Sequence, residues 1–168
     1  QQVIATALLS GIVLDTKDYV LRTSKRTFEA AAFLKENKAD TVAVKKLFSF
    51  SSETINLKNE ILNNAEIYRD CMISFSRSDS EDIRVITAKA ADEMLNIRNV
   101  KASFVLSRLG NDIIQISARS LGEENVQLIM ENLGGGGHST MAAAQIKNAD
   151  LETAKNMLLK AIDNYYLA

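Results

Sequence analysis

Residues 126–146 read VQLIMENLGGGGHSTMAAAQI: an apolar stretch, four consecutive glycines, the single histidine of the chain and a second apolar stretch. The apolar spacing predicts a helix over residues 126–133 and a short strand over 142–146. Glycine allows positive φ and close approach of a ligand to the backbone, and consecutive amides can form a concavity for an anion such as phosphate. His138 adds a side chain that donates or accepts a hydrogen bond. Because a helix C-cap needs only one glycine, four of them favour a binding function.

The segments on either side of this run alternate between strand and helix patterns. Turn residues 109–112, including Asn111, predict a hairpin between two of the strands. A mixed order of this kind indicates an α/β or mixed α+β domain over residues 70–168. The predicted strands are 72–75, 102–107 and 113–119, and the predicted helices are 84–95 and a final one that Asp150 caps, ending at Ile162.

The first seventy residues have helical patterns only. Val3 to Leu14 is apolar with small residues, which predicts a buried helix. The Ser-rich residues 49–52 are the best candidate for a linker, because their hydroxyls compete for backbone groups. The other predicted helices are 27–37 with Ser24 as cap, 41–48 with Asp40 as cap, and 53–68. Because the chain begins inside an apolar periodic segment without an initiator Met, we expect it to be part of a larger protein.

Composition excludes several classes of protein. The 168 residues suffice for one domain, or for one small domain and part of another, and 46% apolar residues allow a sizeable core. A net charge of −1 provides no general attraction for long nucleic acids. The single cysteine, Cys71, lies in an apolar run and is expected to be a core residue in a reducing compartment. No segment has the length and apolarity of a membrane span.

The end of the predicted strand 113–119 carries a second candidate for anion binding. Strand alternation places Ser117 and Arg119 on one face, with Ser120 entering the loop. The planar fork of Arg119 suits the oxygens of a phosphate, and the hydroxyls add donors. Alone, Arg119 would be an ordinary surface arginine. Together with the glycine–histidine run, it favours an anion-binding site.

Asp15 follows the apolar run 3–14, at the point where the periodicity breaks. A carboxylate there is either a hard oxygen ligand for a divalent metal or the cap of a turn, and the local sequence leaves both open. A single carboxylate cannot hold a catalytic metal, and one histidine cannot form a His-rich site. Most ligands of any metal would therefore lie outside this chain.

Taken together, Ser117-Ala118-Arg119-Ser120 and the run from Gly134 to Ala144 resemble the DHH-associated domain of the DHH phosphoesterase superfamily. Ala5 to Lys17 resembles the last motif of its catalytic core. Leu21-Arg22-Thr23 and the segment Arg26 to Ala31 are most similar to GdpP-type cyclic di-AMP phosphodiesterases of Gram-positive bacteria. The resemblance covers essentially the whole chain. It implies the helical end of a DHH domain in residues 1–50, a linker helix in 51–69, and a small mixed-sheet, substrate-binding DHH-associated domain in 70–168.

The resemblance also implies a reaction. Such enzymes hydrolyse a phosphodiester with two divalent metal ions, usually manganese (Mn2+), and Asp15 would be one metal ligand. The substrate, a cyclic dinucleotide or a short oligonucleotide, would be held by the second domain. The residues implied for this are Ser117, Arg119, Ser120, Gly135, Gly136, Gly137 and His138.

The Asp-His-His motif that names the superfamily is absent from these residues. The missing N-terminal DHH portion is therefore an implied partner, and we expect this chain alone to have little or no phosphodiesterase activity. A homodimer is left open. The segment itself is expected to be cytoplasmic and to make no membrane contact, while a membrane anchor upstream in the parent protein is also left open.

Two alternatives remain. One is a nanoRNA or oligonucleotide phosphodiesterase of the same superfamily, which only substrate assays would separate. The other is an RNA-binding accessory domain like that of alanyl-tRNA synthetases. The near-neutral charge weighs against the second alternative, as does the Asp15 segment.

Overall fold

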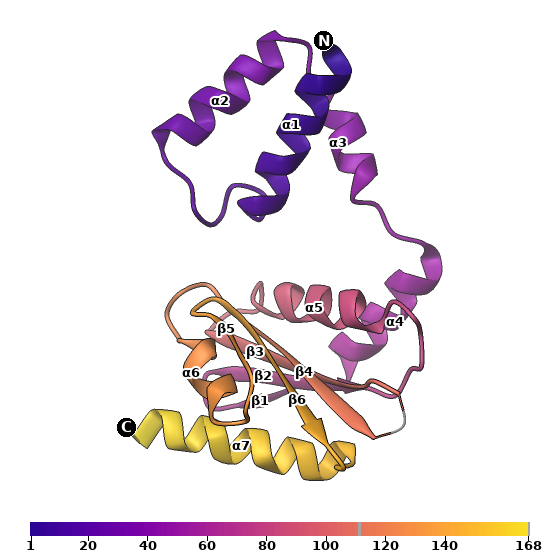
Figure 1. Ribbon diagram of the computed structural model, residues 1–168, viewed down its shortest axis with the longest axis vertical. Coiled ribbons are helices and arrows are strands. Elements are labelled where there is room, and N and C mark those ends of the chain that lie inside the picture. The colour runs from indigo at the N-terminus through magenta and orange to yellow at the C-terminus, as the bar shows by residue number, and fades with distance from the viewer. Residues whose placement is uncertain (111, 168) are drawn as a thin grey trace. The chain divides into compact units, whose positions relative to one another are not determined.

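The computed structural model describes residues 1–110 and 112–167, and the chain divides into two compact units, Gln1–Ser51 and Ser52–Ala168. Asn111, which the sequence places in a turn, lies outside the described residues. The first unit is helical, and the second holds a mixed sheet with helices on both faces (Figure 1).

The first unit is built from three helices around a small core. The helices predicted over 3–14, 27–37 and 41–48 are confirmed within two residues at each end. The helices are α1 Gln2–Asp15, α2 Lys25–Glu36 and α3 Thr41–Leu47. The buried side chains are Ala5, Leu9, Leu34, Ala39 and Val44.

The starts of α2 and α3 follow the predicted caps. The backbone N–H of Ser24 donates to Oγ1 of Thr27 at 3.0 Å. Oδ1 of Asp40 accepts from the N–H groups of Val42 at 2.9 Å and Ala43 at 3.0 Å. These bonds satisfy amides that have no partner inside a helix, and so fix where each helix begins.

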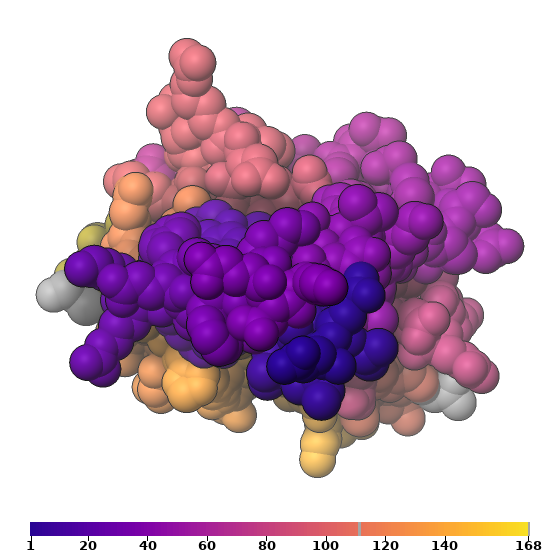
Figure 2. Space-filling model, turned by 90° about the horizontal axis from the view of Figure 1, so that it is seen from above, coloured from indigo at the N-terminus to yellow at the C-terminus, as the bar shows by residue number. Residues whose placement is uncertain are grey.

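The expectation that α1 is buried is wrong for this unit. Val3 is 80% exposed and Ile4 is 66% exposed, because α2 and α3 cover only the side of α1 that carries Ala5 and Leu9. The surface of the unit is drawn in indigo and purple in Figure 2. Among the described residues, no helix is long and apolar enough to cross a membrane.

The second unit contains a six-stranded sheet in the order β1-β2-β3-β4-β6-β5. Strands β2 and β3 are parallel, and every other neighbouring pair is antiparallel. The predicted mixed α/β fold is confirmed. The strands are β1 Glu66–Tyr68, β2 Cys71–Ser76, β3 Ala102–Arg108, β4 Ile113–Ser120, β5 Gly136–His138 and β6 Met141–Lys147. The helices are α4 Ser52–Asn63, α5 Ile83–Met94, α6 Val126–Glu131 and α7 Leu151–Leu167.

Each face of this sheet has its own core. Phe104 and Leu106 of β3 pack with residues of α6 and α7, such as Ile129 and Leu158. Val105, which points to the opposite face, packs with α4 and α5. The period of two along the strand therefore divides β3 between two apolar layers.

The helix predicted over 53–68 is wrong at its end. It stops at Asn63, and Glu66–Tyr68 form β1, in which Glu66 pairs with Ile73 of β2. Ile67, which the helical spacing placed inward, is 68% exposed. Two tertiary interactions outweigh the helical pattern. These residues pair with β2, and Oη of Tyr68 donates to Oδ2 of Asp163 in α7 at 2.8 Å.

Cys71 begins β2 and is fully buried as a free thiol, which confirms it as a core residue. Burial raises the pKa of this thiol to about 11. The thiolate needed for nucleophilic chemistry is therefore disfavoured at neutral pH.

Candidate anion-binding site

An open pocket of about 310 Å³ lies where α5, β4, β5 and β6 meet. This volume is at the small end of the range of about 300–1,000 Å³ for ligand sites. Four of the predicted substrate residues, from two separate segments, line it together. The lining residues are Arg84, Ala88, Gln115, Ser117, Arg119, Gly136, Gly137, Met141, Ala142 and Ala143.

Strand β4 supplies the polar side of the pocket. Gln115, Ser117 and Arg119 alternate along the strand, so their side chains share one face of the sheet. In the register with β6, Ser117 lies opposite Ala143 and Arg119 lies opposite Met141. The small alanine leaves room for a ligand beside the Ser117 hydroxyl.

Arg119 is the strongest anion-binding group in the pocket. Its side chain is 12% exposed, and its Nε lies 3.3 Å from Oδ1 of Asp92 in α5. Nη1 donates to the carbonyl of Ala118 at 2.8 Å, while the buried Nε makes no hydrogen bond. Burial lowers the pKa of Arg119 and Asp92 opposes this shift. The guanidinium remains charged, since arginine does not lose its proton in proteins.

The hydroxyl of Ser117 is oriented by α5. Its Oγ lies 3.3 Å from Oγ1 of Thr87, which donates to the carbonyl of Arg84 at 3.1 Å. Ser117 and Thr87 are both buried. This arrangement holds Ser117 in place at the wall of the pocket.

Ser120 lies apart from the pocket-lining residues. Its Oγ accepts from the N–H of Gly122 at 2.8 Å, and its own N–H donates to the carbonyl of Thr140 at 3.0 Å. The hydroxyl therefore stabilises the loop after β4. Substrate binding by Ser120 stays a prediction.

Gly134 terminates the helical segment that contains α6, which is the role that a C-cap glycine would have. It has a φ of +74°, its N–H donates to the carbonyl of Glu131 at 3.0 Å, and the N–H of Gly135 donates to that of Met130 at 2.9 Å. This pair of bonds is a Schellman motif. The first glycine is therefore explained by helix termination.

Two further glycines are explained by the packing of β5 on β6. A Cβ at Gly135 would lie 2.2 Å from the carbonyl oxygen of Ala143. At Gly137, where φ is +149°, it would lie 2.5 Å from Cα of Ala142. Gly136 differs, because a Cβ there would meet no atom within 4 Å. Within the run of four, Gly136 is the one position where the fold itself does not require glycine.

His138 ends β5, pairs with Met141 of β6 and is exposed. It is not one of the pocket-lining residues, although Met141 opposite it is. The sequence predicted a loop over these residues, whereas Gly136–His138 form an edge strand. Among the residues that the structure describes, β5 pairs only with β6, so one side of its backbone has no strand partner.

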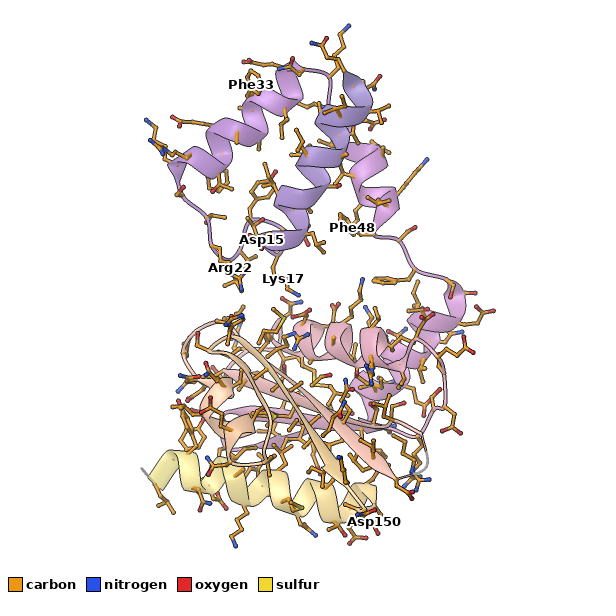
Figure 3. All side chains as sticks on the ribbon, viewed as in Figure 1. Asp15, Lys17, Arg22, Phe33, Phe48 and Asp150 are labelled. Carbon is orange, nitrogen blue, oxygen red and sulfur yellow. The ribbon has the colours of Figure 1, made fainter. Side chains whose placement is uncertain are left out.

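Asp15 lies at the end of α1, where its Oδ1 is 3.2 Å from Nη1 of Arg22 (Figure 3). Both side chains are more than half exposed. Across residues 1–110 and 112–167, no group of three or more His, Cys, Asp or Glu side chains could hold a metal ion. The residues present do not form a metal centre by themselves.

Two pocket residues were missed at the sequence level. Arg84, near the start of α5, is exposed and has no ion pair within the described part of the chain. Nothing in a helical pattern distinguishes this arginine, and only the fold brings it to β4. Gln115 could have been found, because strand alternation places it on the same face as Ser117 and Arg119.

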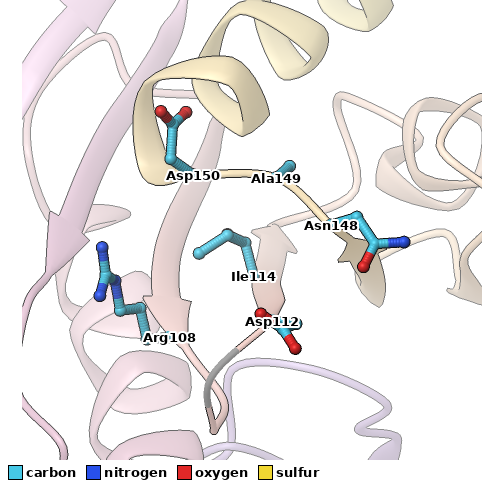
Figure 4. A pocket seen from close by; sticks show the side chains of 6 residues that line it. All are labelled: Arg108, Asp112, Ile114, Asn148, Ala149 and Asp150. Atoms are coloured by element: carbon cyan, nitrogen blue, oxygen red, sulfur yellow. The ribbon is translucent and has the colours of Figure 1, made fainter.

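A second open pocket, of about 320 Å³, is lined by residues near the other end of β4 (Figure 4). It is lined by Arg108, Asp112, Ile114, Asn148, Ala149 and Asp150. Asp150 caps α7, as predicted, by accepting from the N–H of Thr153 at 2.7 Å. With two carboxylates and one guanidinium, this pocket favours an anion less than the first pocket does. The first pocket is lined by Arg84 and Arg119 and is called the arginine-lined pocket.

Comparison with known proteins agrees with the resemblance found in the sequence. The chain is 47% identical over 163 residues to the cyclic-di-AMP phosphodiesterase PdeA of Listeria monocytogenes, covering 96% of this chain and 25% of that relative. It is 42% identical over 165 residues to the cyclic-di-AMP phosphodiesterase GdpP of Bacillus subtilis, with the same coverage. The chain thus spans about a quarter of the length of these relatives.

Among solved structures, an exopolyphosphatase-related protein from Bacteroides fragilis is similar with a TM-score of 0.84 and 21% identity. The similarity covers 96% of this chain and 50% of that one, and it supports the fold. The description of the matching family is "DHHA1 domain", and the match extends over residues 82–167, which hold α5, β3 to β6 and the arginine-lined pocket. The chain belongs to the DHHA1 domain family.

Proposed function

We propose that this chain is the substrate-binding, C-terminal part of a metal-dependent phosphodiesterase that hydrolyses cyclic di-AMP or its linear dinucleotide. The observation that carries the proposal is the pocket in which Ser117 and Arg119 of β4 meet Gly136 and Gly137 of β5. The relatives named as cyclic-di-AMP phosphodiesterases support the substrate class.

In this proposal the chain binds and orients the diester. The guanidinium of Arg119 donates to the non-bridging oxygens of a phosphate, and the hydroxyl of Ser117 adds a donor beside it. The free side of the β5 backbone approaches the ligand at Gly136. Fixing the diester in one orientation lowers the entropic part of the barrier. His138 and Ser120 are proposed to contact the ligand further from Arg119.

Asp15 is proposed as one oxygen ligand of a divalent metal, with manganese as the expected ion. The remaining ligands would come from an N-terminal DHH portion of the same protein. Bound metal ions would supply Lewis-acid chemistry at the phosphoryl group. We therefore expect the 168-residue chain with manganese to hydrolyse cyclic di-AMP far more slowly than the parent enzyme. Equal rates in a direct assay would refute this division of roles.

The test uses the parent enzyme with Arg119→Ala and Arg119→Lys. Titration with cyclic di-AMP and with linear diadenylate should show affinity lowered at least about tenfold by Arg119→Ala, as expected for a lost charge-assisted hydrogen bond. Arg119→Lys keeps the charge but loses the planar fork, so it should recover only part of the affinity. Metal content should stay unchanged in both variants. Unchanged affinity in Arg119→Ala would remove this pocket from the substrate site.

A further inference from the structure

Gln115 is a mostly buried residue whose side chain lines the wall of the arginine-lined pocket. Gln115 is 8% exposed, and no hydrogen bond to its side chain exists within the described residues. A glutamine amide offers two donors and an acceptor oxygen. Because no described protein group uses this amide and it faces the pocket, its donors and acceptor are available to a ligand.

The other two polar side chains on this face of β4 lie beside polar groups of α5. Ser117 meets Thr87, and Arg119 lies beside Asp92. Gln115 instead pairs in register with Ser107 of β3, whose buried Oγ also lacks a partner. Gln115 therefore differs from Ser117 in that no described group of α5 holds its side chain.

We propose that Gln115 recognises the adenine base of the bound nucleotide, which deepens the proposed function and rests on it. The amide oxygen accepts from the N6 amino group and the amide nitrogen donates to N7, which is the bidentate geometry that glutamine makes with adenine. Guanine presents two acceptors, N7 and O6, on the same edge, so the amide oxygen would face an acceptor. Gln115 thus selects adenine over guanine.

The spacing along β4 fits one nucleotide. Gln115 and Arg119 are four residues apart, or about 13 Å along an extended strand, on the same face. Arg119 then binds a phosphate while Gln115 binds the base. Ala88 and Met141, which also line the pocket, supply apolar surface for the ring.

The experiment compares Gln115→Met with Gln145→Met in the parent enzyme. Methionine preserves the length of the side chain and removes the amide. Gln145 of β6 is the register partner of Gln115, is exposed and does not line the pocket, so it is the matched control. Affinities for cyclic di-AMP and cyclic di-GMP are measured by calorimetry, and the thermal unfolding of the ligand-free variants is recorded.

Gln115→Met should weaken cyclic di-AMP binding by about tenfold and reduce the preference for adenine over guanine by a similar factor. Thermal stability should be unchanged, because the amide makes no hydrogen bond to the described residues and methionine keeps the length of the side chain. Gln145→Met should match the wild type. An unchanged adenine preference, or a loss of binding that accompanies a lowered unfolding temperature, would overturn the role of Gln115. Failure of the wild-type enzyme to bind cyclic di-AMP would instead overturn the proposed function.

Discussion

Nε of Arg119 lies 3.3 Å from Oδ1 of Asp92, yet it makes no hydrogen bond. The carboxylate compensates the charge of the buried guanidinium without using its Nε–H. Asp92 therefore holds the guanidinium in position at the wall of the pocket. Asp92 is therefore expected to affect both the stability of the second unit and the position of Arg119 in the pocket.

Asp92→Asn should destabilise the protein, because it leaves the guanidinium of Arg119 buried without a compensating charge. We expect a loss of about 1–3 kcal/mol in the free energy of unfolding, measured by urea denaturation at pH 7. Arg119→Met should cost less, since Asp92 is 32% exposed and can be hydrated. Equal stability of Asp92→Asn and wild type would show that the ion pair contributes nothing.

The glycine run gives a prediction that separates folding from binding. Alanine at Gly135 or Gly137 places a Cβ within 2.5 Å of backbone atoms of β6, and should destabilise by about 1–3 kcal/mol or more. Alanine at Gly136 meets open space and should leave the unfolding free energy within about 1 kcal/mol of wild type. Dinucleotide affinity should nevertheless fall in Gly136→Ala, since Gly136 lines the pocket. Full affinity in a stable Gly136→Ala would mean that no ligand approaches this backbone.

The sequence predicted most of the fold, since periodicity and capping residues determine local structure. Asp40 and Asp150 begin their helices as expected. It failed where tertiary pairing decides the outcome: Tyr68 joins a strand because β2 and Asp163 are there to pair with it. Arg84 was missed because no local pattern shows that α5 lies beside β4.

The four glycines of the run have different structural roles. Four glycines suggested one phosphate loop. Gly134 ends a helix, while Gly135 and Gly137 allow two strands to approach closely. Only the three-dimensional contacts of β6 distinguish these roles from that of Gly136.

Asp163 should make the anchoring of α7 dependent on pH. Its pKa lies below the ordinary value of 3.8, chiefly because the hydroxyl of Tyr68 donates to the carboxylate and then because Arg69 does. A lowered pKa in the folded state means that this contribution to stability is complete above pH 3.8 and is lost as the pH falls through the lowered value. Asp163→Asn should therefore lower the urea midpoint at pH 7, and its difference from wild type should shrink below pH 3.8.

The matched control for Asp163 is Asp79→Asn, at an exposed position before α5. Its urea midpoint should follow the wild type at every pH. A difference between Asp163→Asn and wild type that stays constant down to pH 2 would mean that the carboxylate charge is not what anchors α7.

Arg84→Ala should weaken binding of the dinucleotide by about tenfold, because an exposed guanidinium without an acidic partner at the pocket is available to a second phosphate. The loss should be larger in low salt, where exposed charges are less screened. Arg98→Ala, an exposed arginine shortly after the same helix, should bind as wild type does. Equal affinity of the Arg84 and Arg98 variants would exclude Arg84 from binding.

The double variant Arg84→Ala with Arg119→Ala shows how the two arginines share the ligand. If each binds its own phosphate, the two losses in binding free energy should add to within about 0.5 kcal/mol, as expected for independent groups. If both bind one phosphate, the second substitution should cost much less than the first. Additive losses would therefore favour a ligand with two phosphates over a mononucleotide, which is the property that the proposed substrate class requires of this pocket.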